Sequence, residues 1–328
     1  MQPYISVVVT AYNRKEFLKD SLESLLKQTL PKNEFEVILL TNFEFNIEAY
    51  HSLQIKNHVL EGTAGEFMLE GVKLSKGEVI CFLDDDDIFM EDKLCRVKEI
   101  FQKKPDVGYY KHNFREVDSD LKVLKRNTVK HINEAKYITT SEFKNNFVYL
   151  TFNEVFFNSS TISLRRKIIN ANSEIFFKAS LATDIMLWIV AVINSSALYI
   201  DKSELSLYRI HKMSAIHAAR GDEKYNCKQG ETLPVFATLG ASNRDRNYLL
   251  NLMRLRAEID FALFCKSKFT VRHYIMIFLM ILLSDNRFKV TLVFFKKMKL
   301  MNKPVIIKLL KSEKNIIELL EKFRAAFT

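Results

Sequence analysis

The stretch Glu78–Asp87, EVICFLDDDD, decides the fold and indicates where the functional site lies. Its first six residues, Glu78–Leu83, form a largely apolar run that is typical of a buried strand. Four consecutive aspartates follow directly. In open sheets of parallel strands, ligands bind beyond the carboxyl ends of the strands. The sequence therefore predicts that Asp84–Asp87 line a site at one edge of a sheet.

The chain on either side of this stretch alternates apolar runs with amphipathic segments. This β-α-β-α order predicts an α/β fold with a mostly parallel sheet and helices on both faces. A second polar segment, Thr10–Arg14, ends the first strand and is also expected at the site. Strands are expected at Ile5–Val9, Phe35–Leu40, His58–Leu60, Glu78–Leu83 and Val107–Tyr110, and helices at Lys15–Gln28, Glu66–Ser75 and Glu91–Lys103.

Beyond Val117 the pattern is weaker, and beyond Asp245 it is helical throughout. We therefore divide the chain into an α/β domain, residues 1–240, and a helical C-terminal region, residues 241–328. In the rest of the α/β domain, the expected strands are Thr161–Leu164 and Leu198–Leu207, the expected helices are Ser141–Phe147 and Ala182–Ile193, and Gly221–Gly240 is expected to be a loop. In the C-terminal region, helices are expected at Tyr248–Phe264, Val271–Leu283, Val290–Lys299 and Val305–Phe323.

The composition of the 328 residues is that of a packed globular protein, with 48% hydrophobic residues and five prolines. The four cysteines, Cys81, Cys95, Cys227 and Cys265, form no CxxC pair, which argues against a zinc knuckle or a disulfide scaffold. The N-terminus has no basic segment followed by a long apolar one, so we expect a cytoplasmic protein. The absence of GxxxxGK[ST] and GxGxxG motifs argues against P-loop hydrolysis and dinucleotide redox chemistry.

The net charge of +10 belongs to the C-terminal region. Residues 241–328 hold 18 basic and 7 acidic residues, which leaves 31 and 32 for residues 1–240. Three interpretations stay open: helix packing, a homo-oligomer interface, and contact with an anionic membrane surface at its inner face. The apolar Val271–Leu283 is too short for a membrane span, which needs roughly 20 residues. A nucleic-acid-binding protein is the alternative from another class, but no such motif is present and we expect no nucleic-acid partner.

Four adjacent aspartates repel one another by roughly 1 kcal/mol or more per pair at an effective dielectric constant of about 20. A divalent cation relieves this repulsion, and Mg²⁺ or Mn²⁺ favours carboxylate oxygens. A solvated acidic turn and a structural Ca²⁺ site are the alternatives.

Three segments together resemble the inverting family-2 glycosyltransferases of the GT-A fold: SVVVTAYNR at Ser6–Arg14, KGEVICFLDDDD at Lys76–Asp87 and YRIH at Tyr208–His211. The resemblance covers about residues 1–215. It implies a Rossmann-like sheet, a nucleotide-diphospho-sugar donor, Mn²⁺ or Mg²⁺ as cofactor, and a glycan or lipid-linked acceptor.

The resemblance also implies roles for individual residues. Asp86 would bind the metal, Asp84 the ribose or the metal, and Asp85 would occupy the variable position of D-x-D-D beside the nucleotide. Arg209 would reach the diphosphate and His211 the metal. The nucleobase and ribose would be held by Thr10, Ala11, Tyr12 and Arg14.

The catalytic base of the family matches Asp184 in the segment Ala182–Trp188. An N-cap role for Asp184 is the alternative, as is an ordinary buried histidine for His211. The sequence departs from the family at Asn42, where an aspartate is common, and at Phe67–Gly71, where Ala-Arg-Asn-x-Gly is common. Asn42 is then the nearest polar substitute for contacting the base, and the nucleobase stays open.

The predicted reaction is sugar transfer to an acceptor hydroxyl with inversion. Asp184 would remove the hydroxyl proton. The metal and Arg209 would stabilise the leaving diphosphate. A lipid phosphate acceptor, which needs no base, and a non-catalytic relative are the alternatives.

Overall fold

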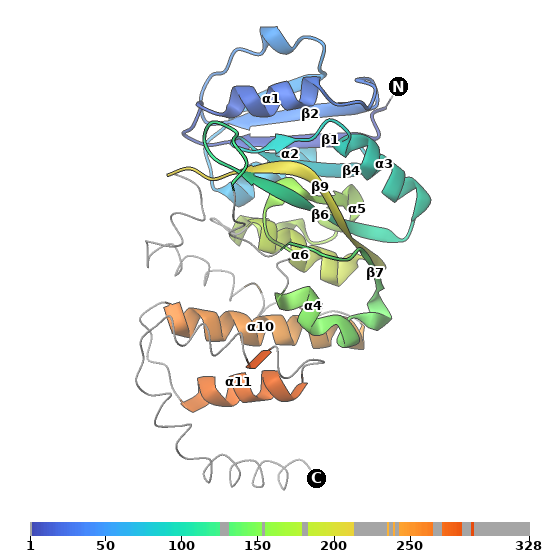
Figure 1. The fold of residues 1–328 in the computed structure, drawn as a ribbon, viewed down its shortest axis with the longest axis vertical. Coiled ribbons are helices and arrows are strands. Elements are labelled where there is room, and N and C mark those ends of the chain that lie inside the picture. The colour runs from blue at the N-terminus through green and yellow to red at the C-terminus, as the bar shows by residue number, and fades with distance from the viewer. Residues whose placement is uncertain are drawn as a thin grey trace, which may run out of the picture.

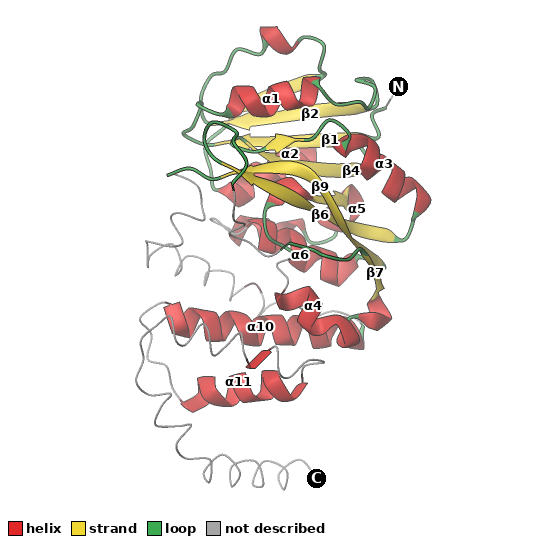
Figure 2. Ribbon diagram, viewed as in Figure 1, coloured by secondary structure: helices red, strands yellow, loops and turns green. Residues whose placement is uncertain are grey.

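A computed structural model of the chain shows a twisted sheet with helices on both faces and further helices beyond one of them (Figure 1). The structure describes residues 2–124, 131–152, 155–178, 183–212, 243–264 and 271–283, together with residues 235, 239, 290 and 291. Figure 2 shows that the strands gather in one part of the molecule and that α10 (Arg244–Phe264) and α11 (Val271–Leu283) lie in another.

In the described part of the chain, nine strands form one sheet in the order β3-β2-β1-β4-β8-β6-β9-β5, with β7 paired to β9. The first four strands of this order are parallel, as predicted. The strand β8 runs antiparallel to both β4 and β6, while β6 and β9 are parallel. The strands are β1 Ile5–Ala11, β2 Phe35–Thr41, β3 Ile55–Val59, β4 Val79–Asp84, β5 Ile88–Phe89, β6 Val107–Val117, β7 Lys136–Thr139, β8 Ile162–Arg165 and β9 Ala197–Arg209.

Alternate residues of each central strand enter two different hydrophobic clusters, because successive side chains of a strand point to opposite faces. In β1, Val7 and Val9 face a cluster formed with α1 (Leu18–Leu26) and α3 (Lys93–Lys103). Val8 faces the other cluster, with α2 (Ala64–Leu74) and α6 (Thr183–Asn194). The result is a three-layer α/β/α domain, which confirms the predicted fold class.

The helix α2 lies close against the sheet because of Gly71. A Cβ atom at this position would come within 2.4 Å of a methyl carbon of Val8. A capping box at Thr63 and Glu66 fixes the start of the helix. The close packing of α2 on the sheet therefore explains why residue 71 is a glycine.

The helix α10 packs on the domain rather than standing apart from it. Its residues Leu249, Leu252 and Met253 belong to the same cluster as α6, as do Met276 and Met280 of α11. The guanidinium of Arg246 also donates to the carbonyl oxygens of Ile193 and Ser195, the latter at 2.8 Å. Packing is therefore one role of these two helices.

Other expectations for the second half of the chain had mixed outcomes. The segment expected as a helix at Ser141–Phe147 forms short 3₁₀ turns, and the α-helix α4 covers Phe147–Phe152 instead. The expected loop Gly221–Gly240 lies outside the described residues, except for residues 235 and 239. The expected helix Val305–Phe323 also lies outside them, as does the expected helix Val290–Lys299 except for its first two residues. Among the helices that the structure describes, none combines the length and the apolar character needed to cross a bilayer.

Candidate active site

The carboxyl ends of β1, β2 and β4 meet at one edge of the sheet. Thr10 of β1 is in register with Asp84 of β4, and Ala11 is in register with Thr41. The acidic run forms the turn from β4 into β5, and β5 pairs with the end of β9 near Arg209. The fold therefore brings the three predicted motifs to one place, as the sequence analysis expected.

Arg14 forms the main charged contacts of the acidic run. Its Nε atom donates to Oδ2 of Asp85 at 2.8 Å, and Nη2 contacts both Oδ1 of Asp85 and Oδ2 of Asp86, the latter at 2.8 Å. The imidazole Nε2 of His211 lies 2.9 Å from the same oxygen of Asp86. Asp85, predicted to be at a variable position, is thus a principal partner of Arg14.

The other two aspartates are held by neutral donors. Ser159 donates its hydroxyl to Oδ2 of Asp84 at 2.7 Å. Asp87 accepts from the side-chain amide of Asn158 at 3.0 Å and from the backbone N–H of Arg209 at 3.1 Å. These contacts fix the orientation of both carboxylates without neutralising them.

Burial raises the pKa values of Asp84, Asp85 and Asp87. It is the largest cause of a pKa of about 7 for Asp84 and about 6 for Asp85. The neighbouring carboxylates raise the pKa further, and the pKa of Asp87 lies well above its ordinary value. Arg14 lowers the pKa of Asp85 but does not outweigh burial. The site thus disfavours a full set of negative charges unless a cation joins it.

Asp184 lies next to this site, in the first turn of α6. Its Oδ1 accepts from the backbone N–H of Ile185 at 2.8 Å, and its Oδ2 accepts from the N–H of Asn158 at 3.3 Å. Asp184 is the second residue of α6, so it is not the N-cap, and its carboxylate is partly buried. Burial raises the pKa of Asp184 to about 6.

Asn158 joins the candidate base to the acidic run, and the sequence analysis missed it. Its backbone N–H contacts Asp184 and its side chain contacts Asp87. Its φ of 65° is unusual for a residue with a side chain, although asparagine tolerates it better than most. The three polar residues Asn158, Ser159 and Ser160, placed just before a strand, were the signal that could have identified it.

The guanidinium of Arg209 binds groups other than the side chains of the acidic run. Its guanidinium donates to the backbone oxygens of Asp86 and Ser119, each at 3.0 Å, and pairs with the carboxylate of Asp20 at 2.7 Å. It also lies over the ring of Phe17, 4.2 Å from the centroid. Arg209 is 1% exposed, so in this structure it ties the acidic turn to α1. Its contact with a diphosphate stays a prediction.

The loop after β1 presents one free aromatic surface. Tyr12 is 51% exposed and packs edge-on against Phe67, with 5.7 Å between ring centroids. Asn42 and Asn13 bind each other: Asn42 accepts from the backbone N–H of Asn13, and its side-chain amide donates to the side-chain oxygen of Asn13, both at 2.7 Å. Asn42 therefore fixes this loop, and Ala11 is fully buried in the core beneath it. Among the predicted nucleotide contacts, Tyr12 has the surface suited to stacking on a base.

A divalent cation fits the site in part. The described residues contain no group of three or more His, Cys, Asp or Glu side chains arranged to hold a metal ion. However, Asp86 and His211 converge, and carboxylate oxygen with imidazole nitrogen is a donor pair that suits Mn²⁺. Arg14 contacts the same oxygen of Asp86 as His211 does. Metal binding by this donor pair stays a prediction.

Lys93 of α3 lies buried beneath the site. Its Nζ donates to the carbonyl oxygen of Ser160 and lies 3.4 Å from the hydroxyl of Ser206. Burial lowers its pKa to about 7. Lys93 thus links α3 to the turn that holds Asn158 and to β9.

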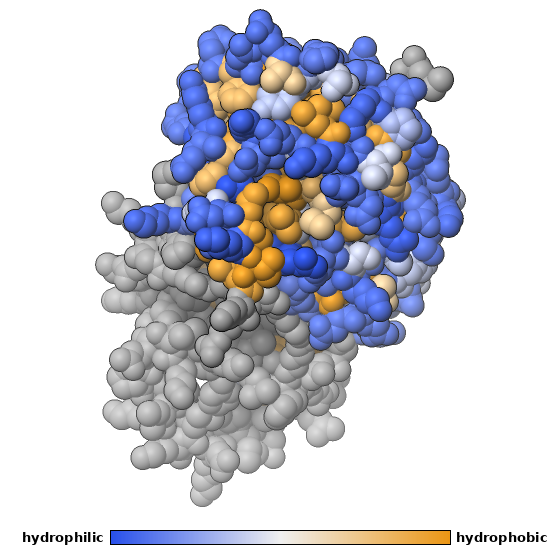
Figure 3. Space-filling view, turned by 45° about the horizontal axis from the view of Figure 1, so that its top comes forward, coloured by the Kyte–Doolittle hydropathy of each residue, from blue (hydrophilic) through white to orange (hydrophobic). Residues whose placement is uncertain are grey.

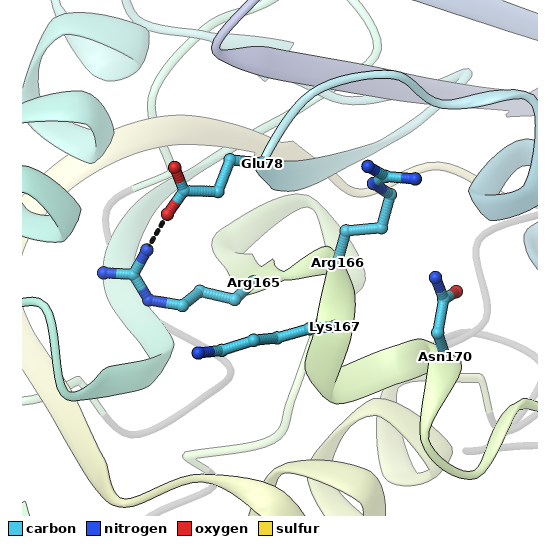
Figure 4. A pocket seen from close by; sticks show the side chains of 5 residues that line it. All are labelled: Glu78, Arg165, Arg166, Lys167 and Asn170. Carbon is cyan, nitrogen blue, oxygen red and sulfur yellow. Dashed lines mark hydrogen bonds and ion pairs between the residues drawn. The ribbon is translucent and has the colours of Figure 1, made fainter.

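A separate pocket of about 400 Å³ lies at the opposite end of β4 (Figure 4). It is lined by Glu78, Arg165, Arg166, Lys167 and Asn170. Arg165 pairs with Glu78 and also donates to the carbonyl oxygens of Phe101 and Val107, at 2.7 and 2.9 Å. Arg165 therefore anchors the end of α3, and this pocket is separated from the acidic run by the length of β4.

One face of the domain is mainly hydrophilic with an apolar area near its centre (Figure 3).

Comparison with known proteins assigns the first half of the chain to a family. A family model described as "Glycosyl transferase family 2" matches residues 6–171, half of the chain. An uncharacterized glycosyltransferase of Haemophilus influenzae is 34% identical over 114 residues, 33% of this chain and 38% of that protein. A poly(ribitol-phosphate) beta-glucosyltransferase of Bacillus spizizenii is 30% identical over 102 residues, 28% of this chain and 16% of that protein.

A solved structure extends the likeness of the fold. The Staphylococcus aureus protein TarS, residues 1–349 in complex with UDP-GlcNAc, superposes with a TM-score of 0.60 at 18% identity, covering 85% of this chain and 81% of that one. Because the curated relatives above match this chain over 16% to 38% of their own length, the activity of a whole relative does not transfer directly.

Proposed function

The chain belongs to glycosyltransferase family 2, and from this premise we propose that it moves a sugar, with inversion, from a nucleotide-diphospho-sugar to an acceptor hydroxyl. Asp184 acts as the general base, and Asp86 with His211 binds Mn²⁺ or Mg²⁺. The proposal rests mainly on the two contacts of Asn158: its backbone N–H donates to Asp184, and its side chain donates to Asp87 of the acidic run. One residue thereby sets the position of the base relative to the groups assigned to the donor.

The base has a chemical task only with a hydroxyl acceptor. A hydroxyl must lose a proton as it attacks the anomeric carbon, and a carboxylate with a pKa near 6 is ionised at neutral pH. The leaving nucleoside diphosphate gains negative charge. A divalent cation, when bound, would stabilise that charge, and the donor groups around Asp86 suit this role.

The donor side of the proposal rests on Tyr12 and on the edge of the sheet. The exposed ring of Tyr12 offers a stacking surface beyond β1, where Thr10 and Asp84 lie side by side. A donor related to UDP-GlcNAc, the ligand of the TarS structure, is the first to test. For the acceptor, poly(ribitol-phosphate) is the first to test, because the Bacillus spizizenii relative is a poly(ribitol-phosphate) beta-glucosyltransferase and TarS is described as a poly(ribitol-phosphate) beta-N-acetylglucosaminyltransferase.

The experiment is a panel of nucleotide sugars, each with Mn²⁺ or Mg²⁺ and with or without acceptor, in which release of the nucleoside diphosphate is measured. We expect one donor to be turned over, and Asp184→Asn to lower the rate by about 10²- to 10⁴-fold. Activity that survives this substitution would favour the phosphate acceptor instead. Folded protein that releases no nucleotide from any donor would refute the proposed function.

A further inference from the structure

We propose that Arg14 is a displaceable internal cation, which occupies the acidic site of the free protein and must leave it before a divalent metal ion binds. The proposal rests on the proposed function for the identity of the metal site. It concerns a property that the free protein shows without any sugar transfer.

The contacts of Arg14 are those of a bound cation. Its guanidinium spans both carboxylate oxygens of Asp85 and one oxygen of Asp86. Its Nη1 atom lies 3.3 Å from Nε2 of His211. Arg14 therefore touches all three side chains on that side of the site, and Oδ2 of Asp86 is shared between Arg14 and His211.

Among the ion pairs of the described residues, Arg14 is the arginine or lysine that pairs with a side-chain carboxylate of the acidic run. The guanidinium of Arg209 is directed to a backbone oxygen of the run and to Asp20. The ammonium of Lys93 is directed to a backbone oxygen of Ser160. Arg14 thus supplies the counter-charge that a metal ion would otherwise supply.

A metal ion held by both Oδ2 of Asp86 and Nε2 of His211 would take the place of the guanidinium, because Nη2 of Arg14 lies 2.8 Å from Oδ2 and Nη1 lies 3.3 Å from Nε2. A divalent cation binds a carboxylate oxygen at about 2 Å, whereas the guanidinium already lies 2.8 Å from that oxygen. The two positive charges would repel, and arginine does not lose its proton in proteins. One of the two cations must therefore leave this position.

The side chain of Arg14 is able to leave without rearranging the fold. It is 18% exposed, so it borders solvent. The adjacent backbone is held by the mutual hydrogen bonds of Asn13 and Asn42, which do not involve the guanidinium. The motion is therefore a change of side-chain conformation on a fixed loop.

A nucleoside diphosphate would favour this motion. The planar guanidinium binds phosphate oxygens by paired hydrogen bonds, so a diphosphate offers the displaced Arg14 a new anionic partner. The metal ion and the diphosphate would then each increase the affinity of the protein for the other, as linkage requires. Arg14 would make the site bind both ligands together in preference to the metal alone.

The test is a titration of the full chain with Mn²⁺, followed by the electron paramagnetic resonance signal of the free ion, without and with UDP. For Arg14→Gln we expect Mn²⁺ alone to bind at least tenfold more tightly than to the wild type, and UDP to increase that affinity less than it does in the wild type. Arg14→Lys keeps the charge but loses the planar guanidinium with its paired donors. Its affinity for Mn²⁺ should therefore lie between those of the wild type and Arg14→Gln. Lys15→Gln removes an equal charge from the neighbouring exposed residue and should leave the affinity unchanged.

Equal or weaker Mn²⁺ binding by folded Arg14→Gln would overturn the proposal, and so would an equal gain in Lys15→Gln, because the effect would then be one of general charge. If Arg14→Gln does not fold, Arg14→Lys decides by the same comparison with the wild type. The two proposals fail separately. Tighter Mn²⁺ binding in a protein that uses no donor supports the role of Arg14 alone, and an active enzyme with unchanged Mn²⁺ binding supports the transferase alone.

Discussion

The substitution Asn158→Ala tests the contacts through which Asn158 connects the acidic run to the candidate base. It removes the side-chain donor to Asp87, 3.0 Å away, and the side-chain oxygen that accepts from the N–H of Ser160 at 2.7 Å. Each such bond contributes about 1 kcal/mol net to stability. The positive φ adds about 1 kcal/mol of strain for alanine. We therefore expect the free energy of unfolding to fall by about 3 kcal/mol in total.

Two further variants separate these contributions. Asn158→Gly loses both bonds but tolerates the positive φ, so we expect it to be about 1 kcal/mol more stable than the alanine variant. Asn158→Asp keeps the acceptor for Ser160, loses the donor and places a carboxyl group against Asp87. It should lose sugar-transfer activity more than its stability explains.

The measurement is urea unfolding followed by fluorescence of Trp188, the one tryptophan of the chain, which is buried in α6. Activity is assayed in parallel at a temperature where every variant is folded. A loss below about 1 kcal/mol for Asn158→Ala would refute the reasoning, since both hydrogen bonds would then contribute nothing net.

Three further predictions concern Asp184, Lys93 and Arg209. Because the pKa of Asp184 is about 6 and the base must be ionised, kcat/KM should fall about tenfold per pH unit below pH 6, whereas the residual rate of Asp184→Asn should lack this limb. Lys93 has a folded-state pKa of about 7 against 10.5 unfolded, so the unfolded state binds more protons between these values, and stability should rise with pH there by up to about 1.4 kcal/mol per unit. Urea unfolding at pH 7 and pH 9 should show this rise in the wild type and a smaller one in Lys93→Met; equal slopes would contradict a neutral buried amine. Arg209→Gln should lower the free energy of unfolding by about 3 kcal/mol without any ligand, because two backbone oxygens and Asp20 lose their donor; a thermal melt that matches the wild type would show that these contacts are dispensable.

The sequence determined the local elements and the place of the site. Apolar runs predict the strands Ile5–Ala11, Phe35–Thr41 and Val79–Asp84. Such a run consists of consecutive residues, so it can be recognised from the sequence alone. Because parallel strands end at one edge of a sheet, the positions of Thr10 and Asp84 were also predictable. The antiparallel insertion of β8 between β4 and β6 was not predictable, since pairing between distant strands leaves no periodic pattern in either one.

Only the tertiary structure decided which partner each charged group has. The pairing of Arg14 with Asp85 and that of Asn158 with Asp87 each join residues 71 positions apart, and the bond from Arg209 to the backbone of Asp86 spans 123. Residue type limits a carboxylate to donors and cations in general, but the choice among them depends on which side chains the folded backbone places within about 3 Å. The sequence therefore predicted a site at the acidic run, whereas the fold decided that Arg14 pairs with Asp85 and Asp86 and that Asn158 connects the run to Asp184.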